Sequence, residues 1–423
     1  TGRNGDSASF KAKGEAEGTQ TVTAQFALLR LYLEPDAKRW LAALFWAALG
    51  VGLMIKGPII LIIVVATLAA LVLWDRSYSW LGRLRPLWGP LLMLAIALPW
   101  YVAIGIVSDG EFYDRAIGQS MVDKIGNSQQ GHKGPFGYHL ALFALMFWPG
   151  SLLIGHAVHT AWRRRGEAAV RFLVCWIVPT WVVFEFVATK LPHYVLPTYP
   201  ALACLCALAL YDPAPSKGMA RRVALVLWSL LWAAATIAIA ALGPAAFRES
   251  EGYIPRPAMA LAAATALAGA AALWFMWRKQ TSRTLMALGA AGLLSWITIF
   301  GVSAPGLTQL WMSPRIDDMV RAARPCENSV LITVPYTEPS LVFLYGREHV
   351  LLAKSGADAA GALAAAPECD VALIGAAERE EFLKRAADLG LAPANIGEIG
   401  GRNYSNGDTL SLTLYRSASH GRQ

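Results

Sequence analysis

The chain has 423 residues, of which 56% are hydrophobic and only 16% are charged, and it contains 16 tryptophans. This composition excludes an ordinary soluble domain and is typical of a membrane protein. The net charge of +8 would suit a nucleic-acid-binding protein, but the lysines and arginines gather in short loops between apolar segments, as the positive-inside rule expects. We therefore predict membrane lipids as partners and no nucleic acid.

The first residues of the chain differ from the rest. Residues 1–21 are rich in Gly, Ser, Thr and charged side chains, and they show no apolar periodicity. They also lack the apolar core of a signal peptide. We predict that this segment is disordered or foreign to the fold.

A transmembrane helical body is predicted over residues 22–304. A bilayer-spanning helix needs about 20 mostly apolar residues, and about nine segments approach that length. They lie near residues 40–55, 57–75, 86–108, 138–158, 172–189, 195–211, 223–242, 259–277 and 284–304.

The loops between these segments predict how the chain is oriented. Basic clusters at residues 76–85, 163–171, 217–222 and 278–283 alternate with connections that are poorer in basic residues. Since Lys and Arg favour the cytoplasmic side of a membrane, we predict that the basic loops are cytoplasmic. The chain is then a multi-pass protein of a bacterial inner membrane, with its C-terminal part in the periplasm.

Residues 305–423 are predicted to form a small extracytoplasmic α/β domain. Residues 329–334 and 370–374 resemble buried strands, residues 377–389 an amphipathic helix and residues 409–415 a half-buried strand. The domain has no glycine-rich phosphate motif and no nucleophile elbow, which favours binding over chemistry. Cys326 and Cys369 lie outside the cytoplasm in this topology, where disulfides form, but the sequence leaves open whether they pair.

Three predicted helix starts on the outer face carry a lysine two residues before a proline. The triplets are Lys56-Gly57-Pro58, Lys133-Gly134-Pro135 and Lys190-Leu191-Pro192. The free N–H groups and the dipole of a helix start favour an anion, and lysine adds a full positive charge. We predict a site for phosphate or another anionic head group; the alternative is that these lysines only anchor the helices at the interface.

Further polar residues surround the triplets. His193 and Tyr194 follow Lys190 and are predicted to donate to the same anion, and His132 precedes Lys133. Glu185 lies within a predicted span, where ionisable groups are functional suspects, although it could also snorkel to the nearby surface. His132 and His139 are too few to make a metal site, so we predict none.

The segment Lys190-Leu-Pro-His-Tyr-Val-Leu-Pro-Thr-Tyr-Pro200 resembles a signature of bacterial phospholipid-carrier-dependent glycosyltransferases. This is the family of the lipid A aminoarabinose transferase, related to protein O-mannosyltransferases. Leu53-Met-Ile-Lys-Gly-Pro-Ile59 and His132-Lys-Gly-Pro-Phe-Gly-Tyr138 resemble it in the same order. The resemblance implies a GT-C fold, that is, an α-helical polytopic membrane protein, here with a small C-terminal extracytoplasmic α/β domain.

The resemblance also implies a function in the cell envelope, such as lipid A modification. Such enzymes transfer a sugar from a polyprenyl-phosphate-linked donor to a lipid or glycan acceptor at the outer face of the inner membrane. It implies that Lys56 and Tyr194 contact the donor phosphate. The sequence requires no cofactor, and nothing in it supports a divalent metal.

One departure from the family concerns the catalytic carboxylate. The family usually carries it in a long loop between its first two spans, and this chain has no such loop before residue 40. We expect an N-terminally incomplete chain with little activity, in which Glu185 and Glu111 are substitute candidates for the base. Two alternatives stay open: a transporter or flippase of lipid-linked glycans, and a non-catalytic remnant of the enzyme.

Overall fold

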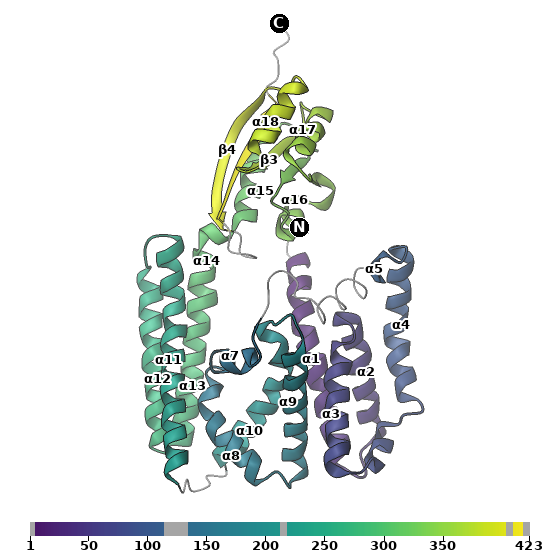
Figure 1. Cartoon of the computed structure of the whole chain (residues 1–423), viewed down its shortest axis with the longest axis vertical. Coiled ribbons are helices and arrows are strands. Elements are labelled where there is room, and N and C mark those ends of the chain that lie inside the picture. The colour runs from purple at the N-terminus through teal and green to yellow at the C-terminus, as the bar shows by residue number, and fades with distance from the viewer. Residues whose placement is uncertain (1–4, 114–133, 212–217, 403–408, 418–423) are drawn as a thin grey trace. The chain divides into compact units, whose positions relative to one another are not determined.

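The computed structural model describes residues 5–113, 134–211, 218–402 and 409–417, without the side chains of residues 5–17 and Lys56 (Figure 1). The chain falls into two compact units. One comprises Thr1–Ile239 and Ala264–Leu293, and the other Ala240–Ala263 and Leu294–Gln423. Each unit is described by itself below.

The first unit is built of helices. In chain order they are α1 (Gly5–Leu33), α2 (Arg39–Lys56), α3 (Ile59–Asp75), η1 (Ser79–Leu84), α4 (Gly89–Val107), α5 (Glu111–Tyr113), α7 (Tyr138–Met146), η4 (Gly150–Leu153), α8 (Ile154–Arg163), α9 (Ala168–Phe186), η5 (Pro192–Thr198) and α10 (Tyr199–Tyr211). Three long helices then run through parts of both units: α11 (Met219–Ser250), α12 (Arg256–Trp277) and α13 (Thr281–Trp296).

The predicted class, a polytopic helical membrane protein, is confirmed. In the described part of the chain, six helices are long and apolar enough to cross a membrane, and a bent pair of helices could make a seventh. The shorter apolar helices α2 and α3 account for the remaining two of the predicted segments.

The predicted span at residues 138–158 is not one straight helix. Its two pieces, Tyr138–Met146 and Gly150–Arg163, meet at an angle of 110°. Pro149 lies at the break, and proline lacks the N–H that would continue the helical hydrogen bonds. The bend leaves α7 as a separate short helix whose start can be held by other parts of the fold.

The first residues also differ from the prediction. Residues 5–21, expected to be disordered or foreign to the fold, form the first part of α1. Ala, Glu and Lys in this segment have high helix propensity, and the helix continues into an apolar part that packs against α2. There Ala24, Leu28 and Leu31 are fully buried, which explains why the helix extends back from that end.

A charged cluster joins three helices of the first unit at the end nearest the predicted basic loops. Arg171 of α9 pairs with Asp75 of α3 at 2.9 Å. Tyr32 of α1 donates to Asp75 at 2.8 Å and accepts a hydrogen bond from Arg171 at 2.9 Å. Each member has two partners, so the cluster fixes the start of α9 relative to α1 and α3.

The second unit contains a five-stranded sheet of order β2-β1-β3-β5-β4. Strands β2, β1 and β3 are parallel, whereas β5 is antiparallel to both β3 and β4. The strands are β1 (Leu331–Val334), β2 (Val350–Leu352), β3 (Val371–Gly375), β4 (Pro393–Arg402) and β5 (Thr409–Ser417). The predicted strands at 329–334, 370–374 and 409–415 correspond to β1, β3 and β5.

Helices cover both faces of this sheet. On one face lie α15 (Met312–Ala323) and α16 (Pro339–Tyr345), and on the other lie α17 (Gly356–Ala365) and α18 (Arg379–Asp388). The predicted helix at residues 377–389 is α18. Short elements complete the unit: η6 (Ile297–Ser303), α14 (Ala304–Gly306), η7 (Thr308–Leu310) and η8 (Arg347–His349).

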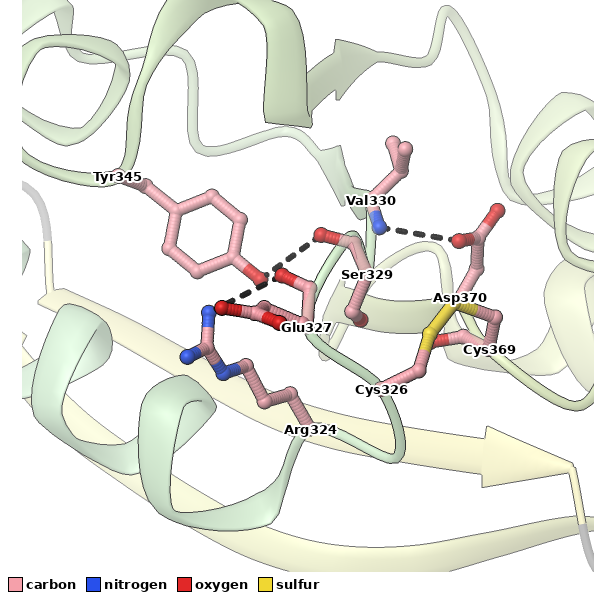
Figure 2. The surroundings of a disulfide bond; sticks show 8 residues. All are labelled: Arg324, Cys326, Glu327, Ser329, Val330, Tyr345, Cys369 and Asp370. Carbon is pink, nitrogen blue, oxygen red and sulfur yellow. Dashed lines mark hydrogen bonds between the residues drawn. A yellow bond between two sulfur atoms is a disulfide. The ribbon is translucent and has the colours of Figure 1, made fainter.

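Cys326 and Cys369 form a disulfide, which the sequence left open (Figure 2). Their Cα atoms are 5.4 Å apart, within the usual range for this bond. The bridge joins the segments that enter β1 and β3. Beside it the Asp370 carboxylate accepts a hydrogen bond from the backbone N–H of Val330 at 2.9 Å, so a side-chain hydrogen bond also joins the two strand entries.

We predict that Arg171→Met destabilises the first unit by about 1.5–3 kcal/mol, because it removes charge-assisted hydrogen bonds from a partly buried carboxylate. Thermal unfolding of the purified chain in detergent measures this. Arg164→Met is the matched control: Arg164 also pairs with a carboxylate, but this carboxylate, Glu167, is exposed, so solvent screens the pair and its loss should change the stability much less. Equal losses in the two variants would contradict a structural role for the cluster.

Candidate functional site

The three lysine–proline triplets lie at helix starts, as predicted. Pro58 immediately precedes α3, Pro192 is the first residue of η5, and Pro135 comes three residues before α7. Proline is tolerated there because the first N–H groups of a helix have no intrahelical partner. What differs between the three starts is the anion available to those N–H groups.

Glu185, in the last turn of α9, supplies that anion to α7. One carboxylate oxygen accepts from the backbone N–H of Gly137 and the other from that of His139, both at 3.0 Å. Gly137 has a φ of +87°, a conformation that glycine adopts without strain. Glu185 thus caps the start of α7 from a different helix, and its negative charge interacts favourably with the positive end of the α7 dipole.

His139 adds a side-chain contact to the same carboxylate. Its Nδ1 lies 3.2 Å from Glu185 Oε1, and its Nε2 lies 3.2 Å from the carbonyl oxygen of Leu191. The ring is completely buried. Each ring nitrogen thus has an oxygen partner, one on α9 and one on the segment after it. His139 therefore ties the start of α7 to the segment that follows α9.

Lys190 completes the cluster. Its ammonium donates to the carbonyl oxygens of Glu185 and Val187 and lies 3.4 Å from Glu185 Oε2. Only 5% of the side chain is exposed. A cation at this place donates to the last carbonyl groups of α9 and interacts favourably with the negative end of the α9 dipole.

Gly134 of the second triplet packs directly on Lys190. A Cβ at residue 134 would come within 2.9 Å of Lys190 Cδ, so the close approach requires glycine. The second and third triplets therefore meet, as expected for motifs on one face of the membrane. Lys133 and His132 themselves lie outside the described residues.

The other residues predicted after Lys190 lie on η5. His193 is exposed and Tyr194 is half-buried. Their rings are in edge contact at 5.3 Å, and the ring of Tyr194 also packs against Phe184 of α9 at 5.4 Å. The ring of Tyr194 thus packs η5 against the end of α9.

The first triplet lies in a different setting. Lys56 is the last residue of α2, and Gly57, with a φ of +72°, turns the chain into α3. Tyr101 of α4 donates to the carbonyl oxygen of Leu53 at 2.9 Å, one turn before this loop. This hydrogen bond fixes the end of α2 to α4.

The two candidate carboxylates differ in surroundings. Each oxygen of Glu185 receives two donors, and 9% of its side chain is exposed. Accepting a further proton would break several of these contacts, so the geometry favours an anchor over a general base. Glu111 is exposed and lies in α5, just beyond α4. Both ring nitrogens of His139 have partners inside the cluster, so these contacts do not support a metal role for His139.

Comparisons with known proteins point in one direction. No protein-family model matches the chain. It is 32% identical over 172 residues to an undecaprenyl phosphate-alpha-4-amino-4-deoxy-L-arabinose arabinosyl transferase of Erwinia tasmaniensis, covering 40% of this chain and 30% of that protein. The protein of the same name from Yersinia pestis is 26% identical over 242 residues, covering 54% and 42%. These matches span less than half the length of the curated relatives.

The fold agrees with these relatives. The crystal structure of ArnT from Cupriavidus metallidurans bound to undecaprenyl phosphate matches with a TM-score of 0.64 at 16% identity, covering 96% of this chain and 75% of that one. The apo state of the same protein matches with a TM-score of 0.63. The chain has the fold of ArnT. The resemblance to carrier-dependent glycosyltransferases and the GT-C fold predicted from the sequence are confirmed.

We predict that Glu185 and Lys190 are energetically coupled in this ArnT-like fold. Glu185→Gln keeps the shape but removes the charge, and Lys190→Met keeps the apolar stem. A double-mutant cycle measured by unfolding in detergent tests this. The double variant should lose at least about 1 kcal/mol less unfolding free energy than the sum of the two single losses, because each single change leaves the other charge buried.

Glu111→Gln combined with Lys190→Met is the control cycle, since Glu111 is exposed on another helix. Its losses should add within about 0.5 kcal/mol. Additive losses in the Glu185–Lys190 cycle would show that the cluster does not hold α7 and α9 together.

Proposed function

We propose that this chain forms the donor-holding part of a glycosyltransferase that takes a sugar from a polyprenyl-phosphate carrier. The observation that carries the proposal is the ArnT fold over nearly the whole chain, together with lysine–proline triplets at three helix starts. The relatives named above act with undecaprenyl phosphate and an aminoarabinose. We therefore propose undecaprenyl phosphate-linked aminoarabinose as the donor.

The contacts of the triplets favour different roles for them. Around the second and third triplets the N–H groups of α7 and the ammonium of Lys190 already face Glu185. We assign Lys190, Glu185 and His139 to positioning. The first triplet has a lysine, a tight turn and the start of α3, with Tyr101 bracing it. We assign the donor phosphate to Lys56, with Tyr194 as its second contact.

This division suits the chemistry of glycosyl transfer from a lipid phosphate. The carrier phosphate leaves readily when its developing charge meets a lysine and the N–H groups of a helix start. An acceptor hydroxyl or phosphate of a lipid or glycan then attacks the anomeric carbon. A carboxylate would remove the proton of a hydroxyl acceptor. We propose Glu111, which is exposed, as this base in preference to Glu185, whose oxygens already accept from the N–H groups of α7 and from Lys190.

Transport of a lipid-linked glycan is the second candidate, and the bent α7–α8 pair is the observation that favours it. Transporters use broken helices whose positive ends face an anionic substrate. Here, however, the start of α7 faces Glu185 rather than an open space. The ArnT fold and this internal cap favour transfer.

The location that we propose is the bacterial inner membrane, with the second unit in the periplasm. The alternating loop charges support this orientation. The Cys326–Cys369 disulfide supports it independently, because disulfides persist in the periplasm and are rare in the cytosol.

We predict that Lys56→Met weakens binding of undecaprenyl phosphate by roughly 1.5–3 kcal/mol, the contribution of a charge-assisted hydrogen bond. Binding to the purified chain in nanodiscs can be measured by native mass spectrometry or lipid titration. Arginine at this position should restore binding only in part, because its planar fork differs from a compact ammonium.

Lys38→Met is the matched control, since Lys38 is exposed at the opposite end of the same helix. It should leave the affinity unchanged. If Lys56→Met binds undecaprenyl phosphate as tightly as the Lys38→Met control, the phosphate lies elsewhere and Lys56 only anchors α2.

The orientation has its own test. A reporter that is active only in the periplasm should work when fused after Tyr415 and fail when inserted in residues 163–171, because the loop charges place these points on opposite sides. The opposite pattern of activity would place all three triplets in the cytosol and overturn the proposed site.

A further inference from the structure

A groove of about 600 Å³ lies between α8, α9 and α10 and is bounded at one end by the beginning of α11. Its size is within the range of known ligand pockets. Apart from His159, Arg165 and Arg221, every side chain lining it is apolar or aromatic. Its α9 residues, Val174, Ile177 and Val178, lie in the middle of that helix, whereas Glu185 lies in the last turn and does not line the groove, so the proposed donor site does not use it.

Tryptophan and arginine mark one edge of the groove. Trp74 and Trp162 line it and are largely exposed. The guanidinium of Arg165 lies 4.6 Å from the centre of the Trp162 ring and donates to the Trp162 carbonyl oxygen at 2.7 Å. Exposed tryptophan rings prefer the head-group layer, and arginine extends its charge towards it. This edge therefore lies at the membrane surface beside the basic loops.

Arg221 provides a second positive charge at the groove. Its Nε atom is buried and has no hydrogen-bond partner among the described residues. Among the described residues, no carboxylate lines the groove to neutralise these cations. A buried N–H without an acceptor is costly, and an anionic oxygen would satisfy it.

We propose that this groove binds one anionic phospholipid from the leaflet beside the basic loops. An acyl chain lies along the apolar walls, and the phosphate lies between Arg165 and Arg221. Basic pockets between membrane helices bind anionic head groups in this way. The inference does not depend on the proposed glycosyl transfer, since none of the residues assigned to the donor site lines this groove.

Native mass spectrometry of the 423-residue chain, in micelles with equal phosphatidylglycerol and phosphatidylethanolamine, tests the proposal. We expect phosphatidylglycerol to be retained preferentially. Arg165→Ala and Arg221→Ala should each weaken its retention about fivefold, the effect of one basic residue near an anionic lipid. The matched control is Arg222→Ala, because Arg222 is next in sequence but exposed and outside the groove; it should retain the lipid as the unmodified chain does.

A second pair of variants tests the apolar walls and does not alter charge. Val178 lines the groove with 52% of its surface exposed, and Val182, one turn further along α9 and outside the groove, is 49% exposed. Val178→Trp should fill the groove and release the lipid, whereas Val182→Trp should not. Equal retention of the two lipids by the unmodified chain, equal loss in Arg221→Ala and Arg222→Ala, or full retention in Val178→Trp would each overturn the proposal.

Discussion

Glu185, in the last turn of α9, joins that helix to the start of α7. An ionised side chain near the end of a membrane helix is costly unless it is paired. Here the N–H groups of Gly137 and His139, the ring of His139 and the ammonium of Lys190 all face this carboxylate. The bend at Pro149 separates α7 from α8. The direction of α7 is therefore not set by α8, and its first residues lie beside the last turn of α9.

For function, this means that the three lysine–proline triplets have different roles. An anion was expected at every lysine–proline triplet, and around the second and third triplets the chain supplies its own in Glu185. A second anion there would have to displace a carboxylate that is held by four donors. We therefore propose the loop at Lys56 as the place of the ligand phosphate. Tyr101 braces that loop from α4, as the cluster around Glu185 braces α7.

Much of the fold could be predicted from the sequence because apolar length and loop charge are local signals. The strands β1, β3 and β5 also carried a clear pattern. By contrast, β4 contains Pro393 and three glycines, and it is a strand only because β5 pairs with it at the edge of the sheet. The cluster around Glu185 could not be predicted, since it joins residues 46 positions apart in sequence. The triplets could be recognised in the sequence, but the contacts around them depend on how the helices pack.

The central claim is that Glu185 serves as an internal anion, so that the lipid phosphate binds at the first triplet. A cryo-electron microscopy structure of the chain in a nanodisc with undecaprenyl phosphate tests it most directly. The account predicts the phosphate within hydrogen-bonding distance of Lys56 and Tyr194, with the contacts of Glu185 to Gly137, His139 and Lys190 intact. A phosphate bound to Lys190 in place of Glu185 would contradict it.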